Sequence, residues 1–248
     1  MRPRPARRPD RGPARTAATR VALCCAVLLG VAVLVGAGLV VTRFLALSRA
    51  EVALSERIRP PGDGAPLPAV TLGGSPVARP EREGDADRYP SLAVRVEEVR
   101  RPVVGPVVVT VSATGVTVPD DPAAAPGMDS GTVSVLMGGD ALGRALGVDG
   151  LLLANADDSS LAGGTELLAR LTAPDGATGL VRLVADRSGA RLEPVDPGSA
   201  RFALRLPADL LPAGAAVDEL VVRGGTLSAT GRLPGPALDP RALAADAG

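Results

Sequence analysis

The side chains that most often carry enzymatic chemistry are scarce in this chain. All 27 basic residues are arginine, with no lysine and no histidine, and the two cysteines, Cys24 and Cys25, lie together inside an apolar run. Serine–histidine, cysteine–histidine and Schiff-base mechanisms therefore lack their components. Outside that run there are also no nitrogen or sulfur ligands for zinc. We expect no catalytic residues, no metal site and no cofactor.

Carboxylates are the remaining candidates. The adjacent pairs are Glu97-Glu98, Asp120-Asp121 and Asp157-Asp158. Neighbours on a strand point to opposite faces, so such pairs do not converge on one substrate. A two-carboxylate glycosidase stays formally possible, but solvated turn acids explain the pairs better. The charge run Arg79–Arg88 holds four acids, yet its interleaved arginines and its spacing do not match a calcium loop.

The most distinctive stretch is Val21–Thr42, which is 22 residues long, has no charged residue and lies between Arg20 and Arg43. A helix of that length spans about 33 Å, close to the hydrocarbon thickness of a bilayer. A buried core helix would normally show a polar stripe, and this run has none. We predict a transmembrane anchor over residues 21–43.

The charges around this run predict its orientation. Seven arginines precede it, so the positive-inside rule predicts that residues 1–20 form a disordered basic cytoplasmic tail. The rest of the chain is then an extracytoplasmic domain on a single-pass cell-membrane protein. A signal peptide cleaved near Ser48 is the alternative, although the apolar run is longer than such peptides usually have.

The exported part is acidic. After Arg43, 19 arginines stand against 26 acidic residues, a net charge of −7. Such a surface cannot displace the counterions of nucleic acid, so we expect no nucleic-acid partner. The arginine-, alanine- and glycine-rich composition without lysine is also typical of a GC-rich bacterial coding sequence.

Periodicity then divides the exported part. Residues 44–61 predict an amphipathic helix, with Leu47, Ala50, Leu54 and Ile58 on one stripe, which ends at Pro60-Pro61. Residues 62–90 read as loop, apart from a short strand at Ala69–Leu72. Residues 62–233 together form the predicted β-rich domain, and 234–248 a flexible tail.

From Ser91 the apolar period becomes two. Two sets of alternating aliphatic residues predict strands with one apolar face: Leu92, Val94 and Val96, then Val107, Val109 and Val111. Further strands are expected at residues 132–137, 165–172, 180–185, 190–195 and 201–206, the last with Phe202, Leu204 and Leu206 on one face. Asp140 is the expected N-cap of a helix over Ala141–Leu146, and Val217–Leu233 predicts a hairpin turning at Gly224-Gly225.

These elements predict an α+β, β-rich fold: an N-terminal transmembrane helix followed by an elongated, curved antiparallel sheet packed on one or two helices. The chain has three aromatic residues, Phe44, Tyr89 and Phe202. A core of valine, leucine and alanine with so little bulk either packs as a narrow sandwich or leaves a lipid-sized cavity. The sequence leaves both possibilities open.

Several short motifs resemble the actinobacterial LmeA-like phospholipid-binding family. They are Thr71-Leu72-Gly73-Gly74-Ser75-Pro76-Val77, Asp87-Arg88-Tyr89 leading into Leu92–Val99, Ala141–Leu146, Arg201–Leu206-Pro207, and Val217–Leu233. The positions that carry the family motif are Gly73, Gly74, Pro76, Arg88 and Tyr89. Ser75 and Val77 stand where the family has phenylalanine, and Asp87 replaces a glycine.

The resemblance implies a fold similar to tubular lipid-binding folds, with a cavity for lipid, and a role in the cell envelope without catalysis. The partners it implies are a phospholipid or other envelope lipid and the membrane bilayer. The lipid-facing candidates are then the nine alternating aliphatic and aromatic residues named above on residues 92–96, 107–111 and 202–206. The alternative is an anchored β-rich module that binds an envelope protein and has no lipid cavity.

Overall fold

The computed structural model describes residues 14–59, 67–74, 81–121, 124–156, 167–186 and 189–237, with side chains described from Leu29 onward except that of Ile58, a residue of the predicted amphipathic stripe. The chain divides into two compact units, Met1–Ala46 and Leu47–Gly248. The predicted family-motif residue Pro76, the pair Asp157-Asp158 and most of the predicted C-terminal tail lie outside the described residues.

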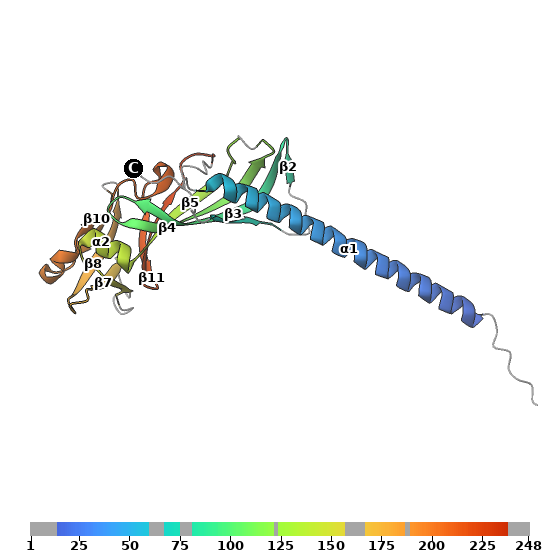
Figure 1. Cartoon of the computed structure of the whole chain (residues 1–248), viewed down its shortest axis with the longest axis horizontal. Coiled ribbons are helices and arrows are strands. Elements are labelled where there is room, and N and C mark those ends of the chain that lie inside the picture. Colours follow the sequence, from blue (N-terminus) through green and yellow to red (C-terminus); the bar gives the residue numbers. More distant parts are fainter. Residues whose placement is uncertain are drawn as a thin grey trace, which may run out of the picture. The chain divides into compact units, whose positions relative to one another are not determined.

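One continuous helix, α1, runs from Ala14 to Ile58 (Figure 1). It begins seven residues before the apolar run, so residues 14–20, assigned above to a disordered tail, are helical. It also continues through the predicted amphipathic helix without a break. Among the described residues, the segment Leu29–Arg57 of this helix is long and apolar enough to cross a membrane.

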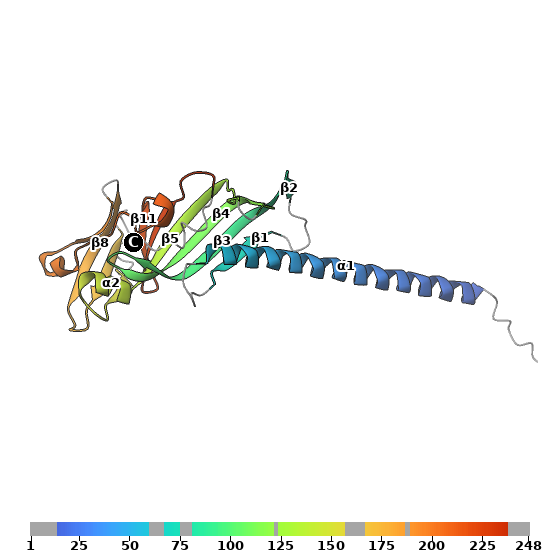
Figure 2. The same cartoon turned by 45° about the horizontal axis from the view of Figure 1, so that its top comes forward.

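The second unit contains two antiparallel sheets rather than the single sheet expected. The larger is seven-stranded, with the order β1-β3-β4-β5-β12-β11 and β2 paired to β3. Its strands are β1 Ala69–Gly73, β2 Glu81–Glu83, β3 Ala86–Arg101, β4 Gly105–Pro119, β5 Ser130–Gly138, β11 Glu219–Arg223 and β12 Thr226–Arg232. Figure 2 shows β3, β4 and β5 running side by side.

The smaller sheet has the order β10-β9-β8-β7-β6. Its strands are β6 Leu152–Asn155, β7 Leu168–Thr172, β8 Thr178–Asp186, β9 Gly189–Pro194 and β10 Leu204–Arg205. The hairpin β11–β12 returns the chain to the larger sheet, where β12 pairs with β5. This pairing places the C-terminal strands beside β5, a strand from the middle of the sequence.

One cluster of buried apolar residues draws its side chains from both sheets and from both helices. In the larger sheet one aligned row consists of Val94, Val111 and Val133 on β3, β4 and β5, all 2% exposed or less. The helix α2, Gly139–Leu146, adds Ala141 and Leu142. The last turns of α1 contribute Leu54, which is 1% exposed, with Leu47 and Ala50 packed beside it.

Three predictions about local structure were wrong. Residues 81–90, expected as loop, form β2 and the start of β3, because the turn at Gly84-Asp85 joins two pairing strands. Strand β6 was missed. The predicted strand 201–206 is a 3-10 helix, Pro197–Phe202, followed by the two-residue β10, because Pro197 and the Asp196 cap start a helical turn that the alternating pattern does not reveal.

Two smaller predictions were also wrong. Gly138, not Asp140, is the N-cap of α2, and Asp140 lies in the first turn. The start of the predicted flexible tail is held in place, because Met128 donates its backbone N–H to Pro236 and Gly127 bridges Ala237. The strand at residues 132–137 and the hairpin of β11 and β12 are confirmed. Helix α2 ends at Gly147, which adopts the left-handed conformation with φ 68°.

Candidate functional site

The six lipid-facing candidates on β3 and β4 share one face. The register pairs Val94 with Val111 and Val96 with Val109, and it sets Leu92 opposite Ala113. Val107 pairs with Val99 beyond a break in the register. All six candidates are 4% exposed or less.

The other three candidates do not form a strand face. Phe202 ends the 3-10 helix and is fully buried against Gly179 of β8, where a Cβ would overlap the ring. Leu204 pairs with Leu192 and is half-buried. Leu206 is buried and donates its backbone N–H to Ala190 at 2.9 Å.

These exposures describe a packed interior at the candidate positions. A side chain that lined a water-sized channel would retain accessible surface, and eight of the nine candidates retain almost none. An acyl chain could reach them only if the layers that cover them moved apart. For lipid to reach these residues, the contact that matters is therefore the one between the end of helix α1 and the sheet.

That contact is made by the last turns of α1 and the edge strand β1. Leu72 donates its backbone N–H to Glu51 Oε1 at 2.9 Å, which satisfies a group on the free edge of the sheet. Ser55 Oγ donates to the carbonyl oxygen of Pro68 at 2.6 Å. Leu54, which lies between Glu51 and Ser55 in the sequence, is buried. We call this set of contacts the helix–sheet seam.

The structure brings three of the family-motif positions to this seam. Gly73 pairs with Ser91, and a Cβ on Gly73 would overlap the Ser91 hydroxyl. Gly74 has φ 144° and lies beside Pro90. Tyr89, next in the chain, is 7% exposed. The glycines thus permit the close approach of β1 to the start of β3.

The ionisation of Tyr89 is affected by a residue of α1. Burial raises the pKa of the Tyr89 phenol, and the negative charges of Asp87 and Glu51 raise it further. The Glu51 carboxylate therefore accepts a hydrogen bond at the sheet edge and also contributes a negative charge to the surroundings of this phenol. The arrangement favours a neutral, protonated tyrosine at the seam.

Arg88 belongs to a different cluster. Its guanidinium donates to Glu83 at 2.9 Å and to Asp129 at 2.6 Å. The hydrogen bond to Glu83 and the charge of Asp129 raise the pKa of Arg88. These exposed ion pairs tie β2 and the loop before β5 to β3, a structural role.

Of the acid pairs, Glu97-Glu98 and Asp120-Asp121 lie within the described residues. Glu97 accepts from Arg95 at 3.1 Å, and Asp120 pairs with Arg82. Glu98 sits in a left-handed conformation, with φ 59°. In the described part of the chain no group of three or more histidine, cysteine, aspartate or glutamate side chains could hold a metal ion.

Sequence reasoning missed a depression on the solvent face of the larger sheet. It is lined by Glu97, Glu98, Pro106, Val107, Val108, Leu136 and Gly138. A β-bulge between Val96 and Val99 shapes it. The signal was available in the sequence, because Val96 and Val99 are three residues apart, which breaks the two-residue alternation at the acid pair.

Comparisons with known proteins do not assign the chain to a family. No family model matches the chain, no curated protein matches it, and no solved structure matches it.

Proposed function

We propose that this protein is a membrane-anchored, extracytoplasmic lipid-binding protein of the LmeA-like type, with no catalytic activity of its own. Its ligand is a phospholipid or another envelope lipid, and its N-terminus is cytoplasmic. The observation that carries the proposal is the continuity of α1, whose apolar segment runs without a break into a domain with an aliphatic interior.

The helix–sheet seam is the proposed entry for the lipid. Leu47, Ala50 and Leu54 cover aliphatic rows of the sheet, and the hydrogen bonds of Glu51 and Ser55 hold the cover in place. An acyl chain that displaced this helical stretch would exchange one apolar contact for another, at little cost in buried apolar area. Movement at the seam would thus admit lipid without unfolding the sheet.

A matched pair of substitutions tests this entry. Ala50 packs against the core, whereas Val52, on the same helical turn, is 53% exposed. The full-length chain is purified from membranes and its bound phospholipid is quantified by native mass spectrometry. Ala50→Phe should fill the seam and reduce bound lipid several-fold, and Val52→Phe should leave it unchanged. Wild-type chain that carries no lipid, and gains none from liposomes, would remove the main support for this function.

The packed core favours a second candidate. Because the lipid-facing candidates on β3 and β4 are buried against their neighbours, the domain also suits a non-catalytic interaction module whose binding surface lies on the outside. In the same experiment this candidate predicts lipid-free protein whose domain remains folded.

A further inference from the structure

One buried side chain at the helix–sheet seam has a polar group that no described residue uses. Tyr89 is 7% exposed, and no described residue accepts a hydrogen bond from its hydroxyl. A phenol that is largely removed from water normally has such a partner. Burial and two negative charges raise the pKa of this phenol, so the hydroxyl is protonated at neutral pH and can donate. Tyr89 therefore supplies one hydrogen-bond donor that is available to a ligand at the seam.

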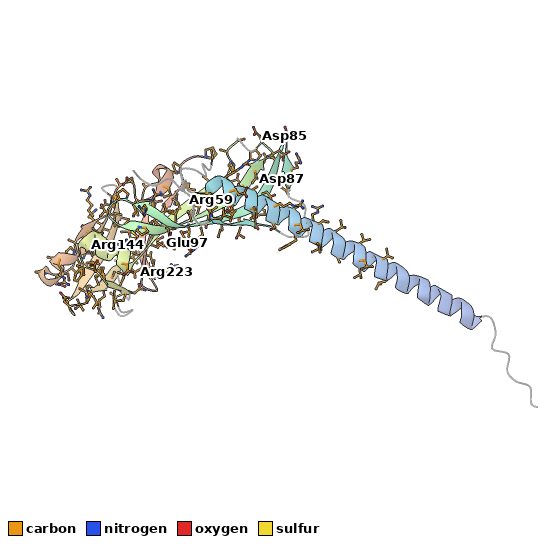
Figure 3. All side chains as sticks on the ribbon, viewed as in Figure 1. Arg59, Asp85, Asp87, Glu97, Arg144 and Arg223 are labelled. Carbon is orange, nitrogen blue, oxygen red and sulfur yellow. The ribbon has the colours of Figure 1, made fainter. Side chains whose placement is uncertain are left out.

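Tyr89 faces the buried side of the larger sheet. Its register partner on β4, Val116, is fully buried. Asp87 precedes Tyr89 by two residues on β3 and so lies on the same face, paired with Val118, which packs against the core. Figure 3 shows Asp87 at the β2 end of β3, whereas Glu97 lies toward the other end. The inner face of β3 thus begins with a carboxylate that is followed by the tyrosine hydroxyl.

Two carboxylates that act on this tyrosine have no cationic partner among the described residues. Glu51 and Asp87 are both half-buried, and neither forms an ion pair with a residue that the structure describes. Oε1 of Glu51 accepts the N–H of Leu72, which leaves its other oxygen available and its negative charge without a counter-ion. The charges that shift the pKa of Tyr89 are those of these two acids. A partly buried charge without a counter-ion is costly, so the seam favours a ligand that brings a positive charge.

We propose that the lipid bound at the seam carries a protonated primary amine in its headgroup, as an ethanolamine phospholipid does, with its ammonium held by Asp87 and Glu51 and a headgroup oxygen accepting from Tyr89. This inference rests on the proposed lipid binding and names the headgroup. An ammonium group has three N–H donors and neutralises the carboxylates, whereas an anionic headgroup would add a like charge beside them. A choline headgroup has the positive charge but no N–H donor, so it should bind less well than ethanolamine.

Competition between headgroups tests the proposal on the full-length chain. The purified protein is equilibrated with liposomes that contain equal amounts of ethanolamine, choline and glycerol phospholipids with identical acyl chains, and bound lipid is counted by native mass spectrometry. Ala50→Phe, which fills the seam, measures the lipid that only surrounds the apolar helix, and that count is subtracted. We expect about tenfold more ethanolamine lipid than glycerol lipid at the seam. Equal amounts, or an excess of glycerol lipid, would overturn the headgroup assignment and leave lipid binding standing. No seam lipid with any headgroup would overturn both.

Variants at the seam separate headgroup recognition from folding. Asp87→Asn combined with Glu51→Gln removes both charges and keeps an amide oxygen that can accept the N–H of Leu72, so it should abolish the preference for ethanolamine lipid. Glu56→Gln, an exposed change on the same helix, should leave the preference intact. Tyr89→Phe removes only the hydroxyl, so it should reduce bound ethanolamine lipid about threefold while the thermal midpoint stays unchanged. If the folded double variant keeps the preference, or Tyr89→Phe leaves the bound lipid unchanged, the proposed recognition is wrong.

Discussion

The two faces of the larger sheet are built from the same strands and have opposite environments. On β4, Val107, Val109 and Val111 point into the core, and the alternate residues Thr110 and Ser112 point outward. On the outward side, hydroxyls of neighbouring strands meet. Thr114 Oγ1 lies 2.8 Å from Ser130 Oγ, and Ser134 Oγ lies 2.8 Å from Thr230 Oγ1.

Position in the register, rather than residue content, decides whether a side chain of these strands is buried or faces water. A shift of one residue would exchange the two faces completely. The inward face cannot tolerate polarity, because its groups are removed from water. The outward face tolerates polarity, because its groups remain in contact with water.

The largest difference between the faces is expected from one substitution made at adjacent residues. Val111→Asp buries a carboxylate among aliphatic side chains and should cost on the order of 4 kcal/mol, which is enough to unfold a marginal domain. Ser112→Asp, one residue along, should cost about 1 kcal/mol or less. Urea denaturation followed by circular dichroism measures both. Similar losses would mean that β4 does not separate inside from outside in this register.

Truncation of two leucines on paired strands gives the next largest effect. Leu227 on β12 is fully buried, whereas Leu136 on β5 is half-buried on the other face. Leu227→Ala should cost about 2–5 kcal/mol through lost burial and a residual cavity. Leu136→Ala should cost about 1 kcal/mol. Urea denaturation midpoints check this, provided that the two variants show equal slopes of unfolding free energy against urea concentration. A larger loss in Leu136→Ala than in Leu227→Ala would contradict the assignment of faces.

A smaller effect tests the close approach of β1 to β3. A Cβ on Gly73 would meet the Ser91 side chain, which can rotate away at some cost. We expect Gly73→Ala to lose about 1 kcal/mol of stability. Adding Ser91→Ala should recover most of that loss, and Ser91→Ala alone is the control. Strict additivity of the two single changes would show that the residues do not touch.

The smallest effect concerns protonation at the seam. The chain has one tyrosine and no tryptophan, so ultraviolet absorbance reports Tyr89 alone. Its pKa should lie above the usual value of about 10, because of burial first and then the charges of Asp87 and Glu51. A raised pKa means that the contribution of Tyr89 to stability is complete below the unfolded pKa and is lost as pH rises through the folded one.

Substitutions divide that shift into its causes. Glu51→Gln should lower the Tyr89 midpoint, because it removes one of the negative charges that oppose ionisation. Glu56→Gln, an exposed change on the same helix, should not move it. An unchanged midpoint in Glu51→Gln would place the end of α1 away from Tyr89 and would weaken the case for the helix–sheet seam.

Much of the fold was predictable where pattern and local chemistry agree. The alternation of aliphatic and polar residues within 92–111 predicted the face that the six candidates on β3 and β4 share. The pair Gly224-Gly225 predicted the turn of the final hairpin. The strand predicted at 201–206 failed because alternation over six residues also suits a capped 3-10 turn, and the Asp196 side chain accepting from the Ser199 N–H selects the turn. The start of β3 was missed because Pro90 argues against a central strand. On β4 the residue between the paired positions Thr114 and Val116 is Gly115, with φ 58°.

The candidate site was less predictable. Gly73, Gly74 and Tyr89 could be picked out as motif positions, but nothing local to them indicated Glu51 as their neighbour, 21 residues before Leu72. The depression depends on the bulge and on Leu136, which arrives from another strand. Such contacts arise from pairing between distant segments, and no property of the separate segments specifies them.

By itself, the sequence determined the apolar segment, the absence of histidine and lysine, and the alternating strands, because these depend on composition and on local periodicity. Only the tertiary structure decided that the strands divide between two sheets, that the aliphatic rows pack together at the candidate positions, and that the end of α1 covers the edge of β1. The physical reason is that burial and edge pairing are properties of two surfaces in contact. A single strand specifies one of those surfaces, and the fold supplies the other.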